Sequence, residues 1–165
     1  MIHSNFKKYF LAFLLLPISC SNSNEQIIDI KITGKVIKIK DGDTIDILFN
    51  GKPLTIRLAH IDCPEYKSKQ PFGSNAKQFT SNLCFSQLVT IESEHKLDRN
   101  KRLIGVVINE FGQNVNKELV KAGLAWHYKK YSNDSSYAIL ENKARQSKIG
   151  LWIDNTPTPP WDWRN

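Results

Sequence analysis

The chain has 165 residues, of which 41% are hydrophobic and 24% are charged, and its formal net charge is +7. These values are ordinary for a single globular domain, and no internal repeat occurs in the sequence, which excludes a repeat architecture. The excess of basic residues suits a polyanionic partner without establishing one.

The first twenty residues differ from the rest of the chain. Two lysines precede a short apolar run, Phe10–Leu16, and the segment closes on Ser19-Cys20. This order of positive charge, apolar run and small residue predicts a signal peptide over residues 1–19. The apolar run is too short to span a bilayer.

Two kinds of export signal fit this segment. One is an ordinary secretory signal. The other is a bacterial lipoprotein signal, because LLPISC resembles a lipobox and makes Cys20 the lipidated first residue. We expect an exported lipoprotein of the cell envelope, anchored to a membrane by the lipid on Cys20, with residues 20–27 as a polar tether.

Three strands are predicted next. Alternating apolar residues indicate a strand over residues 28–39, with a bulge at Gly34. Two further apolar and β-branched runs, residues 44–49 and 54–58, flank Asn50-Gly51, the dipeptide favoured in a two-residue hairpin turn. The three strands therefore form an antiparallel meander.

The ends of this hairpin gather acidic residues around a cation. Antiparallel pairing brings Asp43 close to Asp62, and Glu65 follows. Converging carboxylates repel one another and are costly to bury in the ionised form unless a divalent cation neutralises them. DGD alone fits a solvated turn and CPE alone a strand end, but their occurrence with Arg57 indicates a metal site that faces a phosphate.

The middle of the chain completes a barrel. Residues 66–70 predict a surface loop, and residues 74–84 show the apolar spacing of an amphipathic helix whose buried stripe begins at Phe72. Residues 88–92 and 103–108 predict a fourth and a fifth strand. This order indicates an α+β fold, a five-stranded OB-type Greek-key β-barrel with three α-helices, which commonly binds oligonucleotides or oligosaccharides.

The other two helices lie near the end of the chain. Residues 115–122 predict a short helix that Gly123 terminates, and residues 137–149 predict a longer one with an N-cap in residues 133–136. The remaining segment, residues 154–165, is a Pro/Trp-rich tail that we expect to be irregular and to lie across the surface.

Aromatic rings and cations alternate between these two helices. Such a pattern suits stacking against bases beside a phosphate chain. We expect Trp126 to close the core instead, and Lys129 and Tyr131 to lie on the surface as candidates for nucleic-acid binding.

Two cysteines remain if Cys20 is lipidated. In an oxidising compartment Cys63 and Cys84 either form a disulfide or are two buried thiols, and both alternatives stay open. Neither has the His or Cys neighbours of a zinc site.

Three motifs in one order carry a family resemblance. DGDT at 41–44, TIRL at 55–58 and IDCPE at 61–65 together resemble the signature of the staphylococcal nuclease (thermonuclease) family, and the resemblance covers roughly Lys31 to Trp152. It implies that residues 28–153 form a calcium-dependent nuclease domain. Such an enzyme hydrolyses DNA and RNA to products with 3′-phosphate and 5′-hydroxyl ends.

The resemblance also implies roles for single residues. Asp43 and Asp62 bind Ca2+ through their carboxylates and Cys63 through its backbone carbonyl, a set of oxygen ligands that calcium accepts readily. Glu65 orients or deprotonates the attacking water. His127 is structural, because the family's mechanism uses no histidine.

Two arginines are expected to grip the phosphate. A guanidinium fork matches two phosphate oxygens, and we assign this role to Arg57 and Arg102. The family commonly has a Tyr-Gly-Arg run where this chain has Asn100-Lys101-Arg102, so the glycine is missing and Arg99 is a rival for the second position.

A different class of function also fits the pattern. The alternative is a noncatalytic OB-type surface lipoprotein that binds nucleic acid or another ligand. A decayed copy of a nuclease would be expected to lack one or more of its acidic and basic site residues, but all of them are present. We expect the chain to be a monomeric enzyme.

Overall fold

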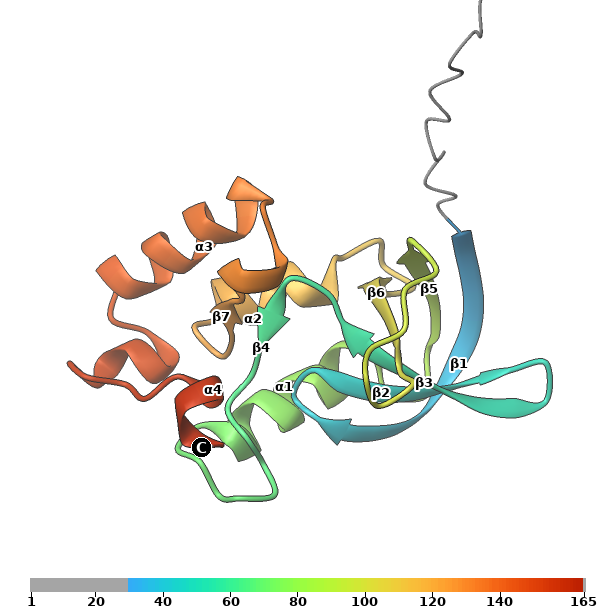
Figure 1. Cartoon of the computed structure of the whole chain (residues 1–165), viewed down its shortest axis with the longest axis horizontal. Helices are drawn as coiled ribbons and strands as arrows, with labels where there is room; N and C mark the ends of the chain where they lie inside the picture. Colours follow the sequence, from blue (N-terminus) through green and yellow to red (C-terminus); the bar gives the residue numbers. More distant parts are fainter. Residues whose placement is uncertain (1–29, 165) are drawn as a thin grey trace, which may run out of the picture.

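The computed structural model describes residues 30–164 (Figure 1). The expected signal peptide (residues 1–19), the tether (residues 20–27) and Cys20 lie outside these residues. Within the described range, no helix has the length and apolar character needed to cross a membrane.

The secondary structure contains both strands and helices, and most of the strands precede the helices α2 to α4. In chain order the elements are β1 (Ile30–Asp41), β2 (Thr44–Phe49), β3 (Lys52–Leu58), β4 (Ile61–Asp62), α1 (Gly73–Cys84), β5 (Leu88–Ser93), β6 (Leu103–Ile108), α2 (Val115–Lys121), β7 (Trp126–His127), the 3-10 turn η1 (Lys129–Tyr131), α3 (Ser135–Gln146), the 3-10 turn η2 (Gly150–Ile153) and α4 (Pro160–Trp163).

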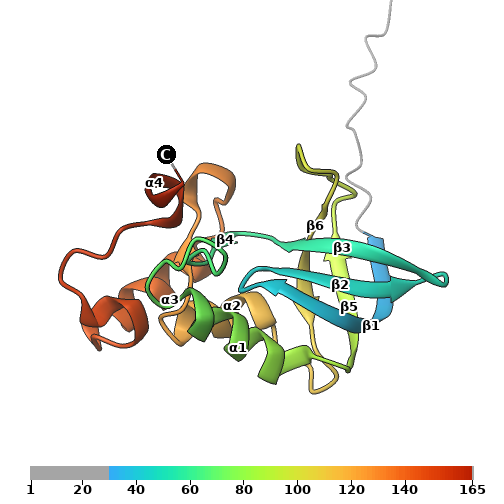
Figure 2. The same ribbon diagram turned by 90° about the horizontal axis from the view of Figure 1, so that it is seen from below.

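The long strands close into a five-stranded barrel, which confirms the predicted fold class. Their order is β1-β2-β3-β6-β5, with β3 and β6 parallel and the other neighbours antiparallel. The 12-residue β1 closes the barrel because its first half pairs with β5 and its second half with β2. Figure 2 shows the barrel on one side of the molecule and α2, α3 and α4 on the other.

The hairpin turn between β2 and β3 forms as predicted. Asn50 and Gly51 both have positive φ, 49° and 74°. Two consecutive residues of positive φ are the requirement of the two-residue turn whose twist matches that of the flanking strands. The turn fixes the register in which Thr44 faces Arg57, and so brings Asp43 to the end of β3.

The predicted bulge at Gly34 is wrong. Gly34 pairs regularly with Val89 of β5, and the register shifts of β1 lie farther along the strand, on both sides of Lys38–Ile39. A Cβ atom at position 34 would lie 2.7 Å from the backbone oxygen of Leu48. Glycine therefore serves a close approach of β2 to β1 and not a bulge.

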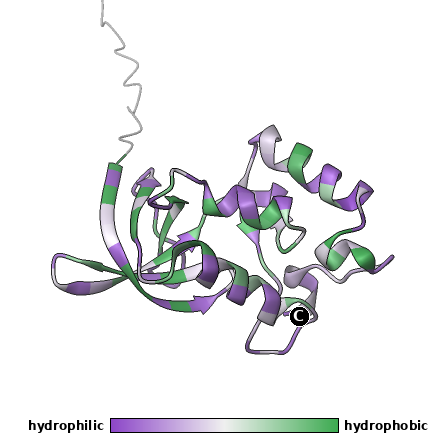
Figure 3. Ribbon diagram, turned by 180° about the vertical axis from the view of Figure 1, so that it is seen from behind, coloured by the Kyte–Doolittle hydropathy of each residue, from purple (hydrophilic) through white to green (hydrophobic). Residues whose placement is uncertain are grey.

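One apolar core fills the barrel and extends under α1 and α2. Figure 3 shows hydrophobic and hydrophilic residues alternating along the helices, as expected where one helix face is buried. A second cluster joins α3, η2 and β7 and includes Trp126, which is only 9% exposed, as expected for a core residue. The largest fully buried side chains are Tyr137, Ile45, Ile47, Ile56, Leu58, Ile61, Ile91 and Leu119.

The tail departs from the prediction of an irregular segment. Residues 160–163 form the short helix α4, which Pro160 begins at a position where no backbone N–H is needed. Trp161 packs edge-on against Trp126, with ring centroids 5.6 Å apart. This contact ties the end of the chain to the second cluster.

Gly150 is where we expect a small substitution to destabilise the fold most. Its φ is +58°, and a Cβ atom would lie 2.2 Å from the backbone oxygen of Gly123. Gly150→Ala should lower the free energy of unfolding by about 3 kcal/mol, because left-handed strain and overpacking add. Gly112→Ala is the matched control, since φ is +75° there but nothing lies within 4 Å of the added Cβ. Equal losses in urea titrations would contradict this account.

We expect the free energy of unfolding to depend on pH through two histidines, His60 and His127. The Nδ1 atom of His60 and the Nε2 atom of His127 each lie 2.9 Å from the hydroxyl of Ser132. Burial lowers the pKa of both histidines below the ordinary value of 6.5. The unfolded state therefore binds protons more readily, and the stability that the neutral rings provide is present above pH 6.5 and is lost as pH falls below it.

A variant separates this effect from other titrating groups. Burial and the charge of Asp43 raise the pKa of Asp41 to about 6. The folded state therefore binds this proton more readily than the unfolded state, and the contribution of Asp41 to stability increases as pH falls below about 6, in the opposite direction to that of the histidines. We therefore compare urea unfolding of the wild type with that of His127→Gln, in which the Asp41 effect is common to both. The stability advantage of the wild type should shrink between pH 8 and pH 5.5; an advantage that is constant with pH would refute the prediction.

Candidate active site

The candidate site lies where the start of β2 and the end of β3 come together. The backbone N–H of Leu58 donates to the backbone oxygen of Asp43 at 2.9 Å, and the N–H of Cys63 donates to the Asp43 carboxylate at 2.8 Å. A two-stranded sheet that the sequence pattern did not predict holds the neighbouring acid, since Asp62 in β4 pairs with Trp126 in β7. Asp43 and Asp62 thus lie side by side on fixed backbone.

Arg57 lies between these two acids. Its Nη2 atom is 2.7 Å from an Asp62 carboxylate oxygen and 3.2 Å from one of Asp43. Its Nη1 atom donates to the backbone oxygens of Leu58 and Ile61, both at 3.0 Å. Burial alone would lower the pKa of Arg57, but the charges of Asp43 and Asp62 outweigh it and raise the pKa. The guanidinium is therefore charged and fixed in position.

Glu65 follows on a segment that Gln70 organises. The N–H of Glu65 donates to the side-chain oxygen of Gln70 at 2.9 Å, and the N–H of Gln70 donates back to the Glu65 backbone oxygen at 3.0 Å. The Glu65 side chain is 25% exposed, so it is open to solvent beside the buried acids. No sequence pattern predicts the role of Gln70, because a glutamine in a polar loop is typical of a surface position.

Arg102 reaches the same place from the start of β6. It pairs with Asp98 at 2.6 Å and donates to the hydroxyl of Thr44 at 3.2 Å, and that hydroxyl donates to Asp43 at 3.0 Å. Lys101 has a φ of +58°, so it adopts without glycine the turn that precedes the arginine. Arg99 is exposed on the loop.

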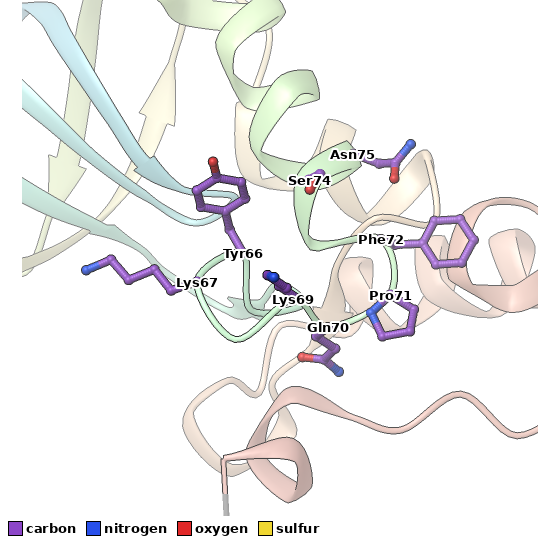
Figure 4. A pocket seen from close by; sticks show the side chains of 8 residues that line it. All are labelled: Tyr66, Lys67, Lys69, Gln70, Pro71, Phe72, Ser74 and Asn75. Carbon is purple, nitrogen blue, oxygen red and sulfur yellow. The ribbon is translucent and has the colours of Figure 1, made fainter.

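An open hollow of about 610 Å³ lies beside Glu65, lined by residues between Tyr66 and Asn75 (Figure 4). Lys67 and Lys69 come from its loop, and the ammonium of Lys77 lies 3.8 Å from the centre of the Tyr66 ring. The hollow is basic and aromatic, a combination that suits a nucleic-acid strand.

A comparison with known families decides the class of the chain. A family model described as "Staphylococcal nuclease homologue" matches residues 55–154. The chain belongs to the staphylococcal nuclease family. The matched range contains Arg57, Asp62, Glu65 and Arg102, and membership confirms the expectation that the chain is a nuclease.

Curated proteins named as nucleases are similar over most of the chain. An "Uncharacterized endonuclease" of Escherichia coli O157:H7 is 41% identical over 162 residues, covering 96% of this chain and 98% of that protein. An "Uncharacterized endonuclease" of Haemophilus influenzae is 43% identical over 135 residues, covering 81% and 74%. The "Micrococcal nuclease" of Shigella flexneri is 41% identical over 141 residues, covering 79% of each chain.

The remaining predicted residues of this nuclease lie in three places. Lys129 and Tyr131 are exposed on η1, and Tyr131 is edge-on to Tyr128 at 4.9 Å between ring centroids.

Cys63 and Cys84 are free, buried thiols, the second of the two alternatives. The Cys84 thiol donates to the backbone oxygen of Thr80, and burial raises its pKa to about 12.

Cys63 offers no thiolate to a metal. Burial, together with Asp43, raises the pKa of its thiol well above the ordinary value. Only its backbone oxygen suits a hard cation at pH 7. This agrees with a site built of oxygen donors.

The oxygen donors of the site are of the kind that binds calcium, although the side chain of Arg164 already contacts two of the carboxylates. In residues 30–164 no group of three or more His, Cys, Asp and Glu residues is arranged to hold a metal ion. The guanidinium of Arg164 nevertheless contacts both Asp62 and Glu65, so a positive charge already stands between these carboxylates. The carboxylates thus stabilise a positive charge at this place in the fold. Their oxygens are of the type that Ca2+ prefers.

Proposed function

We propose that the chain is a calcium-dependent phosphodiesterase that hydrolyses DNA and RNA and leaves 3′-phosphate and 5′-hydroxyl ends. The observation that carries the proposal is the fixed Arg57 guanidinium between Asp43 and Asp62, with Glu65 beside it and Arg102 approaching through Thr44. Two guanidiniums for phosphate oxygens and a cluster of carboxylates for a cation are the parts that phosphodiester hydrolysis needs.

The geometry supports a role for each of these residues. Asp43, Asp62 and the backbone oxygen of Cys63 would hold Ca2+, which supplies charge withdrawal from the scissile phosphate when bound. Arg57 would bind the phosphate from a second side. Its carbonyl and carboxylate partners fix the orientation of the guanidinium group. Glu65, the most exposed of the three acids, accepts a proton from the attacking water or orients it.

Incubation of the purified protein with plasmid DNA and with RNA tests the proposal. Cleavage of both in the presence of calcium, and its loss with a chelator, is the expected result. Retention of nucleic acid without cleavage would instead support the noncatalytic binding lipoprotein. The absence of both cleavage and binding would refute both.

The choice between Arg102 and Arg99 makes a separate prediction. Arg102 is joined to Asp43 through Thr44, whereas Arg99 is exposed. Arg102→Ala should lower kcat by about 10²- to 10³-fold, because one preorganised charge at the phosphate is lost. Arg99→Ala should leave kcat nearly unchanged in the same plasmid assay. The reverse pattern would assign the phosphate-binding role to Arg99 in place of Arg102.

We also propose export, from the sequence of residues 1–20. A lipid-anchored envelope protein with a modified Cys20 is the favoured form, and a secreted monomer is the alternative. Mass spectrometry of the mature N-terminus distinguishes the two, because a diacylglyceryl group on Cys20 adds a mass that signal cleavage alone does not.

A further inference from the structure

The C-terminal tail is fixed across the candidate active site by hydrogen bonds and by the packing of Trp161. The side-chain amide of Gln70 donates to the backbone oxygen of Thr158 at 2.8 Å, and the indole N–H of Trp163 donates to the hydroxyl of Ser68 at 2.9 Å. The ring of Trp161 stacks on Tyr128, nearly parallel at 4° and with 5.2 Å between centroids. Figure 1 shows the resulting position of α4, beside the segment that follows β4.

These contacts place Arg164 next to Asp62 and Glu65. Its Nη2 atom lies 2.7 Å from Asp62 Oδ2 and its Nη1 atom 3.3 Å from Asp62 Oδ1, while Nη1 also donates to the carboxylate of Glu65. Asp62 Oδ1 accepts in addition from Arg57. Both oxygens of Asp62 are therefore paired with guanidinium groups, and one of those groups comes from the tail.

Arg164 and a metal ion have conflicting requirements here. A cation bound to Asp43 and Asp62 would lie close to the positive charge of Arg164, which itself contacts Asp62, and like charges at such a separation repel strongly. A guanidinium remains protonated in proteins, so it cannot relieve the conflict by losing a proton. It has to move, and its side chain, which is 38% exposed against 13% for Arg57, is free of the packing that fixes Arg57.

We propose that Arg164 is a built-in competitor of the catalytic cation, and that calcium must expel its guanidinium from Asp62 and Glu65 to bind. This inference rests on the proposed calcium dependence. The apparent calcium affinity is then lower than the intrinsic affinity by the fraction of time for which Arg164 is away from the acids. By linkage, calcium must also weaken the attachment of the tail to the same extent.

Calorimetric titration of calcium into the metal-free protein tests the first consequence without any activity assay. Arg164→Gln should bind calcium about tenfold more tightly if the guanidinium is docked for about 90% of the time in the wild type. Lys143→Gln is the matched control, since it removes one positive charge from an exposed position on α3. Its calcium affinity should equal that of the wild type.

The indole N–H signals of a ¹H–¹⁵N spectrum test the second consequence. Calcium should shift the signal of Trp163, whose N–H is bonded to Ser68, and leave that of the buried Trp152 in place. Trp163→Phe assigns the signal. In Arg164→Gln the Trp163 signal should respond less to calcium, because the competitor is gone.

The outcomes separate this inference from the proposed function. Equal calcium affinity in Arg164→Gln and the wild type would overturn the competition and leave the calcium-dependent nuclease standing. Equal tightening in Lys143→Gln would also overturn it, since net charge alone would then explain the effect. If neither form takes up calcium, both the competition and the calcium dependence are wrong, and cleavage with a chelator present decides whether the nuclease remains.

Discussion

Glu65→Gln is expected to lower kcat on plasmid DNA by about 10²- to 10⁴-fold at saturating calcium, because the amide cannot accept the proton of the attacking water. The shape of the side chain is conserved, and apart from the contact of its carboxylate with Arg164 the hydrogen bonds of this residue are made by its backbone with Gln70. The fold should therefore be unaffected, with circular dichroism and urea unfolding close to those of the wild type.

Glu110→Gln provides the control for this exchange. Glu110 is exposed in the turn after β6, so the same loss of one carboxylate should not change turnover there. Wild-type turnover in Glu65→Gln would remove Glu65 from the mechanism. A drop confined to subsaturating calcium would make it a metal ligand and not a group that acts on water.

Arg57→Lys is expected to lower kcat by about 10²- to 10³-fold. A single ammonium replaces a planar fork that now contacts Asp62, Asp43 and two backbone oxygens. Lysine keeps the charge but cannot hold the acids and present a second edge to the phosphate together. The lost hydrogen bonds should also lower the free energy of unfolding by about 1 to 3 kcal/mol.

The same exchange at Arg99 is the control, because that side chain is exposed and should tolerate lysine in both assays. Turnover measured at saturating calcium separates loss of the phosphate clamp from loss of the metal. If Arg57→Lys retained full turnover, the fork geometry would have no part in catalysis and charge alone would suffice.

The part of the site that lies on the hairpin could be predicted from the sequence. Asn50-Gly51 sets the turn, the turn sets the register, and the register brings Asp43 to the end of β3 near Asp62. Local turn chemistry and alternation thus determine which distant acids meet. The five barrel strands followed from the same periodicity.

The contacts that close the site from elsewhere could not be predicted. The β4–β7 pair consists of two residues on each side, too few for any alternation to appear, yet it fixes Asp62. Arg164 reaches Asp62 across 102 positions of sequence, through packing of Trp161 on Tyr128. Side-chain packing over such separations leaves no periodic signal in a single sequence.

The disagreement over the bulge has the same origin. Glycine in a strand fits either a bulge or a close approach of two backbones, and only the position of the Leu48 backbone oxygen decides between them at Gly34. Lys101 is the reverse case, because a residue without the freedom of glycine adopts positive φ at the turn before Arg102. The missing glycine therefore did not remove the arginine from the site.

End-group analysis of a defined oligonucleotide cut with calcium present tests the central claim most directly. If Asp43, Asp62 and Glu65 gather a cation and an attacking water opposite Arg57, the products should carry 3′-phosphate and 5′-hydroxyl ends and should disappear with a chelator. Intact oligonucleotide at saturating calcium, or cleavage that a chelator leaves unchanged, would contradict the account.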